Sequence, residues 1–195
     1  MCVCDPTFSG KNCDFAITTL QTTTTAMPVA TVMYCHFSLD LCGWTQSDKD
    51  DFDWTRHRGT TSSHGTGPDG DHTDAQGQGY YLYTESSSPR HPSDTADLIS
   101  PELPANTAVC LKMFTNMYGM TVGSIDVLAR GSSEPNSNQL IAHFIHATPM
   151  PVWVERTVNI PAQPSTFNVI IRGTQGTGFQ GDAAIDDIII YEGQC

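Results

Sequence analysis

The chain has 195 residues, 38% of them hydrophobic and 15% charged, and a formal net charge of −12 with only nine Lys and Arg. An acidic surface repels polyanions, which argues against nucleic acid and anionic membranes as partners and favours a cation or a basic protein surface. No apolar run reaches the ~20 residues of a membrane span, and the first residues lack the shape of a signal peptide. We therefore expect an internal fragment of a longer chain, without direct membrane insertion.

The chain begins with a cysteine-rich segment, residues 2–13, and carries seven Cys in all. The segment resembles the last third of an EGF-like module, so residues 1–14 are assigned to such a fragment. The matching motif positions are Cys4, Phe8, Gly10 and Cys13. The resemblance implies a bond between Cys4 and Cys13, while Cys2 would pair with an upstream Cys that this chain lacks. That missing partner explains the odd number in a protein that otherwise pairs its cysteines.

Residues 15–33 form a Thr-rich stretch that contains Pro28 and shows no hydrophobic period. Such a composition predicts a linker, and in a secreted chain it favours O-glycosylation. A plain tether without glycans would space the neighbouring modules equally well. The globular domain is assigned to residues 34–195.

Within this domain, short alternating runs are separated by turns rich in Gly, Pro and Ser. The expected strands cover 79–83, 108–116, 124–130, 139–146, 152–160, 167–173 and 183–191. No long helical pattern interrupts them, so the sequence predicts an all-β antiparallel sandwich.

Strict alternation also predicts which side chains of a strand share a face. In 139–146 it groups Leu140 with Ala142 and Phe144. In 183–191 it groups Ile189 and Tyr191 with the apolar residues at 183 and 185.

Several motifs occur in an order and spacing that together resemble a MAM domain over residues 35–195. The motifs are CHF at 35–37, LCGWTQ at 41–46, DFDWTR at 51–56, GP at 67–68, DHT at 71–73, GYYLY at 79–83, GFQGD at 178–182 and AIDDI at 184–188, closed by Cys195. The resemblance implies a jelly-roll sandwich with two disulfides, Cys35 with Cys42 and Cys110 with Cys195. It also implies an extracellular module, secreted or on a cell surface, that recognises a protein partner of the same or another kind.

Two adjacent carboxylates, Asp186 and Asp187, lie inside an otherwise apolar strand, so at least one of them should point inward. A buried carboxylate needs a partner. In MAM domains and related calcium-bearing jelly rolls this strand helps to hold a cation, and Asp53 and Asp71 lie in matching motifs. We therefore predict one calcium site formed by Asp53, Asp71 and one of the adjacent pair.

Two observations weigh against that site. Many MAM domains carry Glu where this chain has Ser38, which would leave water or a carbonyl in its place. The acidic run at 48–53 also reads equally well as a solvated loop.

No catalytic motif is legible, since both the Gly-x-Ser-x-Gly elbow and the His-Glu-x-x-His arrangement are missing and every Cys is assigned. The sequence therefore predicts a non-enzymatic adhesion or recognition module. One alternative is a calcium-dependent carbohydrate-binding jelly roll, for which Trp153 is the best exposed stacking candidate. Another is an accessory domain of a secreted metalloprotease.

Overall fold

The structure is a computed structural model that describes residues 31–74, 76–145 and 147–195. The predicted EGF-like fragment with its bond between Cys4 and Cys13, and nearly all of the predicted linker, lie outside the described residues.

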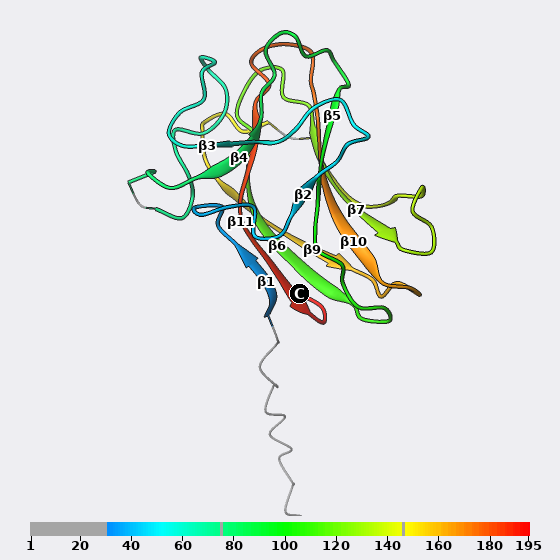
Figure 1. Ribbon diagram of the computed structural model, residues 1–195. Helices are drawn as coiled ribbons and strands as arrows, with labels where there is room; N and C mark the ends of the chain where they lie inside the picture. The colour runs from blue at the N-terminus through cyan, green and yellow to red at the C-terminus, as the bar shows by residue number, and fades with distance from the viewer. Residues whose placement is uncertain (1–30, 75, 146) are drawn as a thin grey trace, which may run out of the picture.

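The described residues form two antiparallel sheets packed face to face, with no helix among them (Figure 1). The first sheet has the order β3 (Thr55–His57), β4 (Tyr81–Thr84), β11 (Ala183–Glu192), β6 (Val109–Asn116) and β9 (Val154–Ile160), and β1 (Thr31–Cys35) pairs with β11. The second has the order β2 (Thr45–Gln46), β5 (Thr95–Ile99), β10 (Phe167–Thr174), β7 (Ser124–Gly131) and β8 (Gln139–Phe144). The predicted all-β jelly-roll sandwich is confirmed.

The core lies between the two sheets and is built from alternate residues of their long strands. These include Val109, Leu111 and Met113 of β6, Ile125 and Val127 of β7, and Phe167, Val169 and Ile171 of β10. Two tryptophans close the same core, because Trp44 and Trp54 are only 3% and 2% exposed. The indole Nε1 of Trp54 donates to the carbonyl of Ala96 at 2.9 Å, so its polar atom is also satisfied.

A β-bulge interrupts β11 where it pairs with β6, between Asp186 and Ile189. A bulge adds one residue to a strand and thereby reverses which side chains face inward beyond it. Ile188 accordingly lies in the core at 0% exposure, and Ile189 does not. The prediction that Ile189 and Tyr191 share the core face with the earlier residues of the strand is wrong for this reason.

A second irregularity lies in β8, where Ala142 pairs with Val127 but Leu140 pairs with Leu128, so that Ile141 is skipped. Leu140 therefore leaves the face that Ala142 shares with the core, and its side chain is 57% exposed. Its predicted grouping with Ala142 is wrong.

The first described residues lie beside the C-terminal strand. β1 starts with Thr31 opposite Tyr191 of β11, so residues 31–33 of the predicted linker are part of this strand. Disulfides join Cys35 to Cys42 and Cys110 to Cys195, which are the two pairings that the resemblance implies. The loops before β11 and after β6 lie at the end of the sandwich opposite the start of β1 (Figure 1).

Candidate functional site

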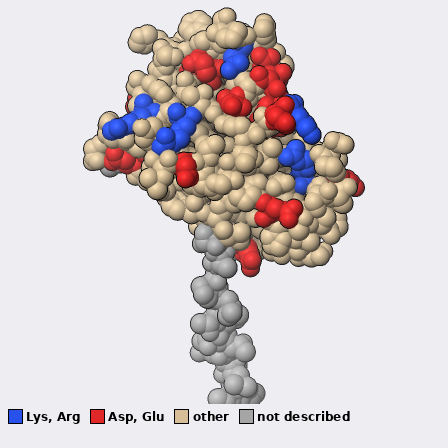
Figure 2. Space-filling view, in the orientation of Figure 1, with Lys and Arg blue, Asp and Glu red and all other residues tan. Residues whose placement is uncertain are grey.

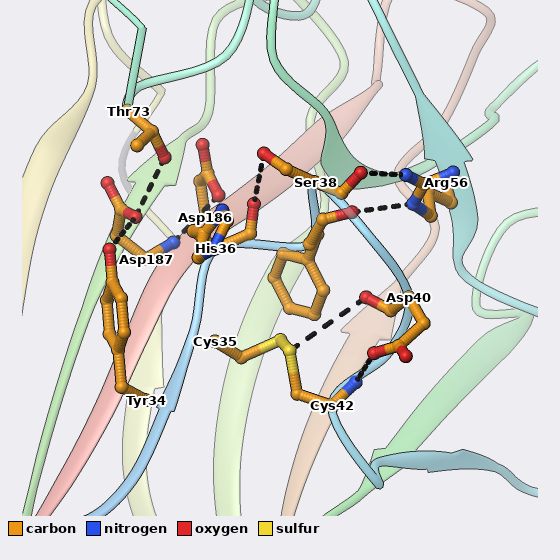
Figure 3. Close-up of a disulfide and its surroundings, with 11 residues drawn as sticks. Tyr34, Cys35, His36, Ser38, Asp40, Cys42, Arg56, Thr73, Asp186 and Asp187 are labelled. Atoms are coloured by element: carbon orange, nitrogen blue, oxygen red, sulfur yellow. Dashed lines mark hydrogen bonds between the residues drawn. A yellow bond between two sulfur atoms is a disulfide. The ribbon is translucent and has the colours of Figure 1, made fainter.

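The adjacent carboxylates of β11 are both buried, Asp186 at 0% and Asp187 at 9% exposure. Simple alternation would send them to opposite faces, but Asp187 adopts a left-handed backbone with φ 48° at the bulge. Asp tolerates this region better than most residues with a Cβ. The bulge thus brings two negative charges into the protein side by side (Figure 3).

Asp187 is held by side chains from two distant segments. Its Oδ2 lies 2.7 Å from His72 Nδ1, and its Oδ1 accepts hydrogen bonds from Thr73 Oγ1 at 2.8 Å and Tyr34 Oη at 3.3 Å. Burial and the negative charge of Asp187 raise the pKa of the Tyr34 phenol. These contacts fasten β1 and the loop before β4 to β11.

Asp186 accepts its hydrogen bonds from the backbone. The N–H of His72 donates to Oδ2 and the N–H of Asp187 donates to Oδ1, both at 2.8 Å. The pKa of Asp186 is raised to about 7. Burial makes the largest contribution, the charges of Asp187 and Asp71 add to the rise, and the two N–H donors oppose it.

Asp71 lies within electrostatic reach of this pair and is 6% exposed. The N–H of Gly79 donates to its Oδ1 at 2.8 Å, and the N–H of Asp74 donates to its Oδ2 at 3.0 Å. Every carboxylate oxygen of Asp71, Asp186 and Asp187 therefore accepts a hydrogen bond from the protein. We call these three residues the acidic cluster.

Asp53 does not join the acidic cluster. It is exposed in the loop between β2 and β3, where its charge contributes to a raised pKa of Asp50 after the larger effect of burial. In the same loop, Asp50 accepts from the N–H of Asp97 and Asp51 accepts from the N–H of Thr95. The acidic run at 48–53 thus supplies acceptors for the edge of β5.

The carbonyl groups near Ser38 are also engaged. The Arg56 guanidinium donates to the carbonyl oxygens of Phe37 at 2.6 Å and Ser38 at 2.7 Å (Figure 3). These carbonyl oxygens are therefore bound to a guanidinium, although a carbonyl or water had been expected to replace the missing Glu as a cation ligand. Over residues 31–74, 76–145 and 147–195, no group of three or more His, Cys, Asp or Glu side chains is arranged to hold a metal ion.

Aromatic rings cover one side of the acidic cluster. The His72 ring stacks on Phe114 with centroids 3.4 Å apart, and Trp153 meets it edge-on at 6.3 Å. Trp153 is half-buried against Tyr81, and its Nε1 donates to the carbonyl of Gly70 at 3.0 Å. Its ring thus takes part in internal packing.

The sequence pattern did not reveal Tyr34 and His72 as partners of the acidic cluster. The two residues lie 153 and 115 positions from Asp187 along the chain. His72 stands in a motif that the resemblance used, but no spacing rule links it to a carboxylate so far away.

In the described part of the chain no helix is long and apolar enough to cross a membrane.

Comparison with known families gives one clear match. The family model described as "MAM domain, meprin/A5/mu" matches residues 35–195. MAM domain-containing glycosylphosphatidylinositol anchor protein 1 of Rattus norvegicus is 36% identical over 167 residues, which is 83% of this chain and 17% of that protein. MAM domain-containing protein 2 of Mus musculus is 30% identical over 83% of this chain and 23% of its own length. The chain thus spans less than a quarter of these relatives.

Solved structures share the fold at low sequence identity. A structure of the CBM22-1 and GH10 modules of endo-1,4-beta-D-xylanase 10B from Clostridium thermocellum matches with a TM-score of 0.57 at 14% identity over 84% of this chain and 28% of that one. A cleaved adhesin domain of Lys-gingipain from Porphyromonas gingivalis matches with a TM-score of 0.56 at 18% identity over 83% of this chain and 97% of that one. Identities this low support the β-sandwich fold alone.

Proposed function

The chain belongs to the MAM domain family, and from this membership we propose that it is a non-catalytic recognition module that binds another protein outside the cell. The observation that carries the proposal is the 36% identity, over 83% of the chain, to a protein named as a glycosylphosphatidylinositol anchor protein. The domain is extracellular, which agrees with its disulfides, because such bonds persist in oxidising compartments.

The polar chemistry of the domain supports a binding role rather than catalysis. The acidic cluster is satisfied by internal donors and covered by aromatic rings. In the described ranges, the histidines that form side-chain hydrogen bonds do so with carboxylates or a carbonyl, and none pairs with a hydroxyl or thiol nucleophile. A nucleophile needs a base within hydrogen-bond reach. We therefore propose that the domain is not an enzyme.

The charge distribution supports a basic partner. The viewed face carries Asp and Glu gathered toward its upper part, with few Lys and Arg between them (Figure 2). With a net charge of −12, the chain attracts positively charged surfaces over distances of about a Debye length and repels negative ones.

The proposal is tested by presenting the chain in multivalent form to a panel of purified extracellular domains, including its own. We expect saturable binding to at least one of them, weakened by added salt because the chain is acidic. Reduced and unfolded chain serves as the control. If no ectodomain binds above that control, the proposed binding function is wrong. Turnover of a peptide, ester or glycoside substrate would contradict the proposal that the domain is not an enzyme.

We also propose calcium binding, with the ligand set narrowed to Asp71, Asp186 and Asp187. Buried carboxylates without a Lys or Arg ion pair favour a cation, but the donors of His72 would have to move, so we expect weak affinity, about 10⁻⁴–10⁻³ M. A tenfold excess of calcium would add about 1.4 kcal/mol and raise the melting temperature by roughly 3–5 °C.

Thermal melts in calcium and in chelator measure this rise. Asp187→Asn should abolish it, and the matched control Asp53→Asn should keep it. An identical melting temperature in both buffers would mean that the protein donors alone hold the cluster.

A further inference from the structure

A cavity of about 550 Å³ opens beside the loop between β3 and β4. Most of its wall is the loop 60–69, and Tyr118 and Pro151 from two other loops complete it. Its volume falls in the range of roughly 300–1,000 Å³ that is usual for ligand sites. Neither the acidic cluster nor the disulfides contribute to it.

The wall is held in place by hydrogen bonds to its neighbours. The carbonyl of Tyr118 accepts from Gly67 N at 3.0 Å and from Thr66 Oγ1 at 2.9 Å. Thr66 Oγ1 in turn accepts from the N–H of Asp182 at 2.8 Å, and Gln180 Nε2 donates to the carbonyl of His64 at 3.2 Å. The loop is therefore fixed before any ligand arrives, which lowers the entropic cost of binding.

The charge around the cavity is negative. Asp69 lies in the wall, is exposed, and has no ion-pair partner among the described residues. Ser62, also in the wall, donates to the carboxylate of Glu85 at 3.2 Å. No Lys or Arg lines the cavity. A cationic group would be attracted here, and an anionic one repelled.

Exposed apolar side chains lie close in sequence to two of the wall residues. Met150 precedes the wall residue Pro151 and is 59% exposed, and Met120, two residues after Tyr118, is 86% exposed. The two loops are joined, because Thr148 N donates to the carbonyl of Met117 at 2.9 Å. Exposed Met is enriched at protein interfaces and adapts to varied partners.

We propose that this cavity receives a basic side chain, Lys or Arg, from the protein partner. The aliphatic stem would lie against Tyr118 and Pro151, and the cationic head would reach Asp69. Met120 and Met150 would pack around the point of entry and exclude water. The proposal rests on the proposed protein-binding function and names the surface and the chemistry that the partner must present.

The test is a two-dimensional amide NMR titration of the full chain with N-acetyl-lysine methylamide and, separately, N-acetyl-arginine methylamide. We expect saturable shifts at Gly65, Thr66 and Gly67 with at least one probe, and the tighter probe identifies the side chain. N-acetyl-norleucine methylamide, which keeps the stem but lacks the charge, should bind at least about fivefold more weakly.

Asp69→Asn should weaken binding of the charged probe by about fivefold or more, and the matched control Asp53→Asn should leave that binding unchanged. The proposal is wrong if the charged and uncharged probes bind equally well, or if both variants weaken binding of the charged probe equally. It is also wrong if only methyl glycosides shift the amide signals.

Binding to the ectodomain panel separates this proposal from the protein-binding function. If the chain binds an ectodomain and Asp69→Asn binds it equally well, the cavity proposal is wrong and the function stands. If no ectodomain binds, the function fails, whatever the probes do.

Discussion

Asp182 directly precedes β11 and is fully buried. Its Oδ2 has no hydrogen-bond partner among the described residues. Its Oδ1 accepts from the N–H of Ser86 at 3.0 Å and from the Ser86 hydroxyl at 2.8 Å. Burial raises the pKa of Asp182, and the bonds from Ser86 oppose that rise. When Asp182 is ionised, its buried charge therefore lowers the stability of the folded state.

Because the folded pKa of Asp182 is raised, the folded state binds this proton more tightly than the unfolded state does. The charge therefore costs no stability at low pH and an increasing amount as the pH rises above the ordinary Asp range of ~4. We expect Asp182→Asn to become more stable relative to the wild type when the pH is raised from 4 to 8. Urea unfolding at both values measures the difference, with exposed Asp53→Asn as the control. A difference that is the same at both pH values contradicts the prediction.

One ion pair on the outer face of the second sheet is largely shielded from water. Arg172 Nε and Nη2 donate to the two oxygens of Asp97 at 2.6 and 2.7 Å, and the side chains are 30% and 7% exposed. We expect Asp97→Asn to lower the free energy of unfolding by about 1–3 kcal/mol, since the fork loses its charged acceptor.

The exposed pair of Lys112 and Glu155, 3.7 Å apart, is the matched control. Glu155→Gln should cost less than about 1 kcal/mol in the same urea experiment. Equal losses at the two sites would show that shielding from water does not strengthen the Asp97 pair.

At the scale of elements, the bulge in β11 predicts different losses of stability when two neighbouring isoleucines are mutated. Ile188 is fully buried in the core, and Ile189 is partly exposed on the other face. Ile188→Ala should therefore cost about 2–5 kcal/mol of unfolding free energy. Ile189→Ala removes the same atoms from a less buried site and should cost roughly 1 kcal/mol. If Ile189 proved the more costly of the two, the strand would lack the bulge.

β5 shows why some elements escape sequence analysis. The run 95–99 was not among the expected strands, although Ala96 and Leu98 face the core and Asp97 between them faces the other side of the sheet. The compensating charge, Arg172, stands on β10 and is 75 residues away. A strand that buries a carboxylate is recognisable only when its partner is known.

For the whole molecule, the two disulfides close loops of very different length. Cys110 and Cys195 are 85 residues apart, and Cys35 and Cys42 are seven apart. In the chain-entropy model, removing the long bridge costs roughly 4–5 kcal/mol and removing the short one about 2.5 kcal/mol. Melting of the Cys110→Ala/Cys195→Ala and Cys35→Ala/Cys42→Ala variants tests the order. A larger loss from the short bridge would show that strain or local packing dominates the loop term.

The sequence by itself determined the fold class and most of the long strands, because period-two alternation in β6, β7 and β10 depends only on neighbouring residues. The family motifs also pointed to Asp71, Asp186 and Asp187, which the fold brings near one another, and to Asp53, which is exposed in the loop between β2 and β3. The register beyond each bulge was decided only in three dimensions, because one inserted residue reverses every later side chain.

Only the tertiary structure showed which side chains donate hydrogen bonds to the acidic cluster. Tyr34 and His72 reach Asp187 because β1 pairs with the end of β11 and the loop before β4 folds over it. The cavity walled by residues 60–69 arises in the same way, since Tyr118 and Pro151 reach it from other loops. Local patterns predict which side chains are buried only along an uninterrupted strand, whereas contacts between distant segments depend on how whole strands are aligned and where the chain turns.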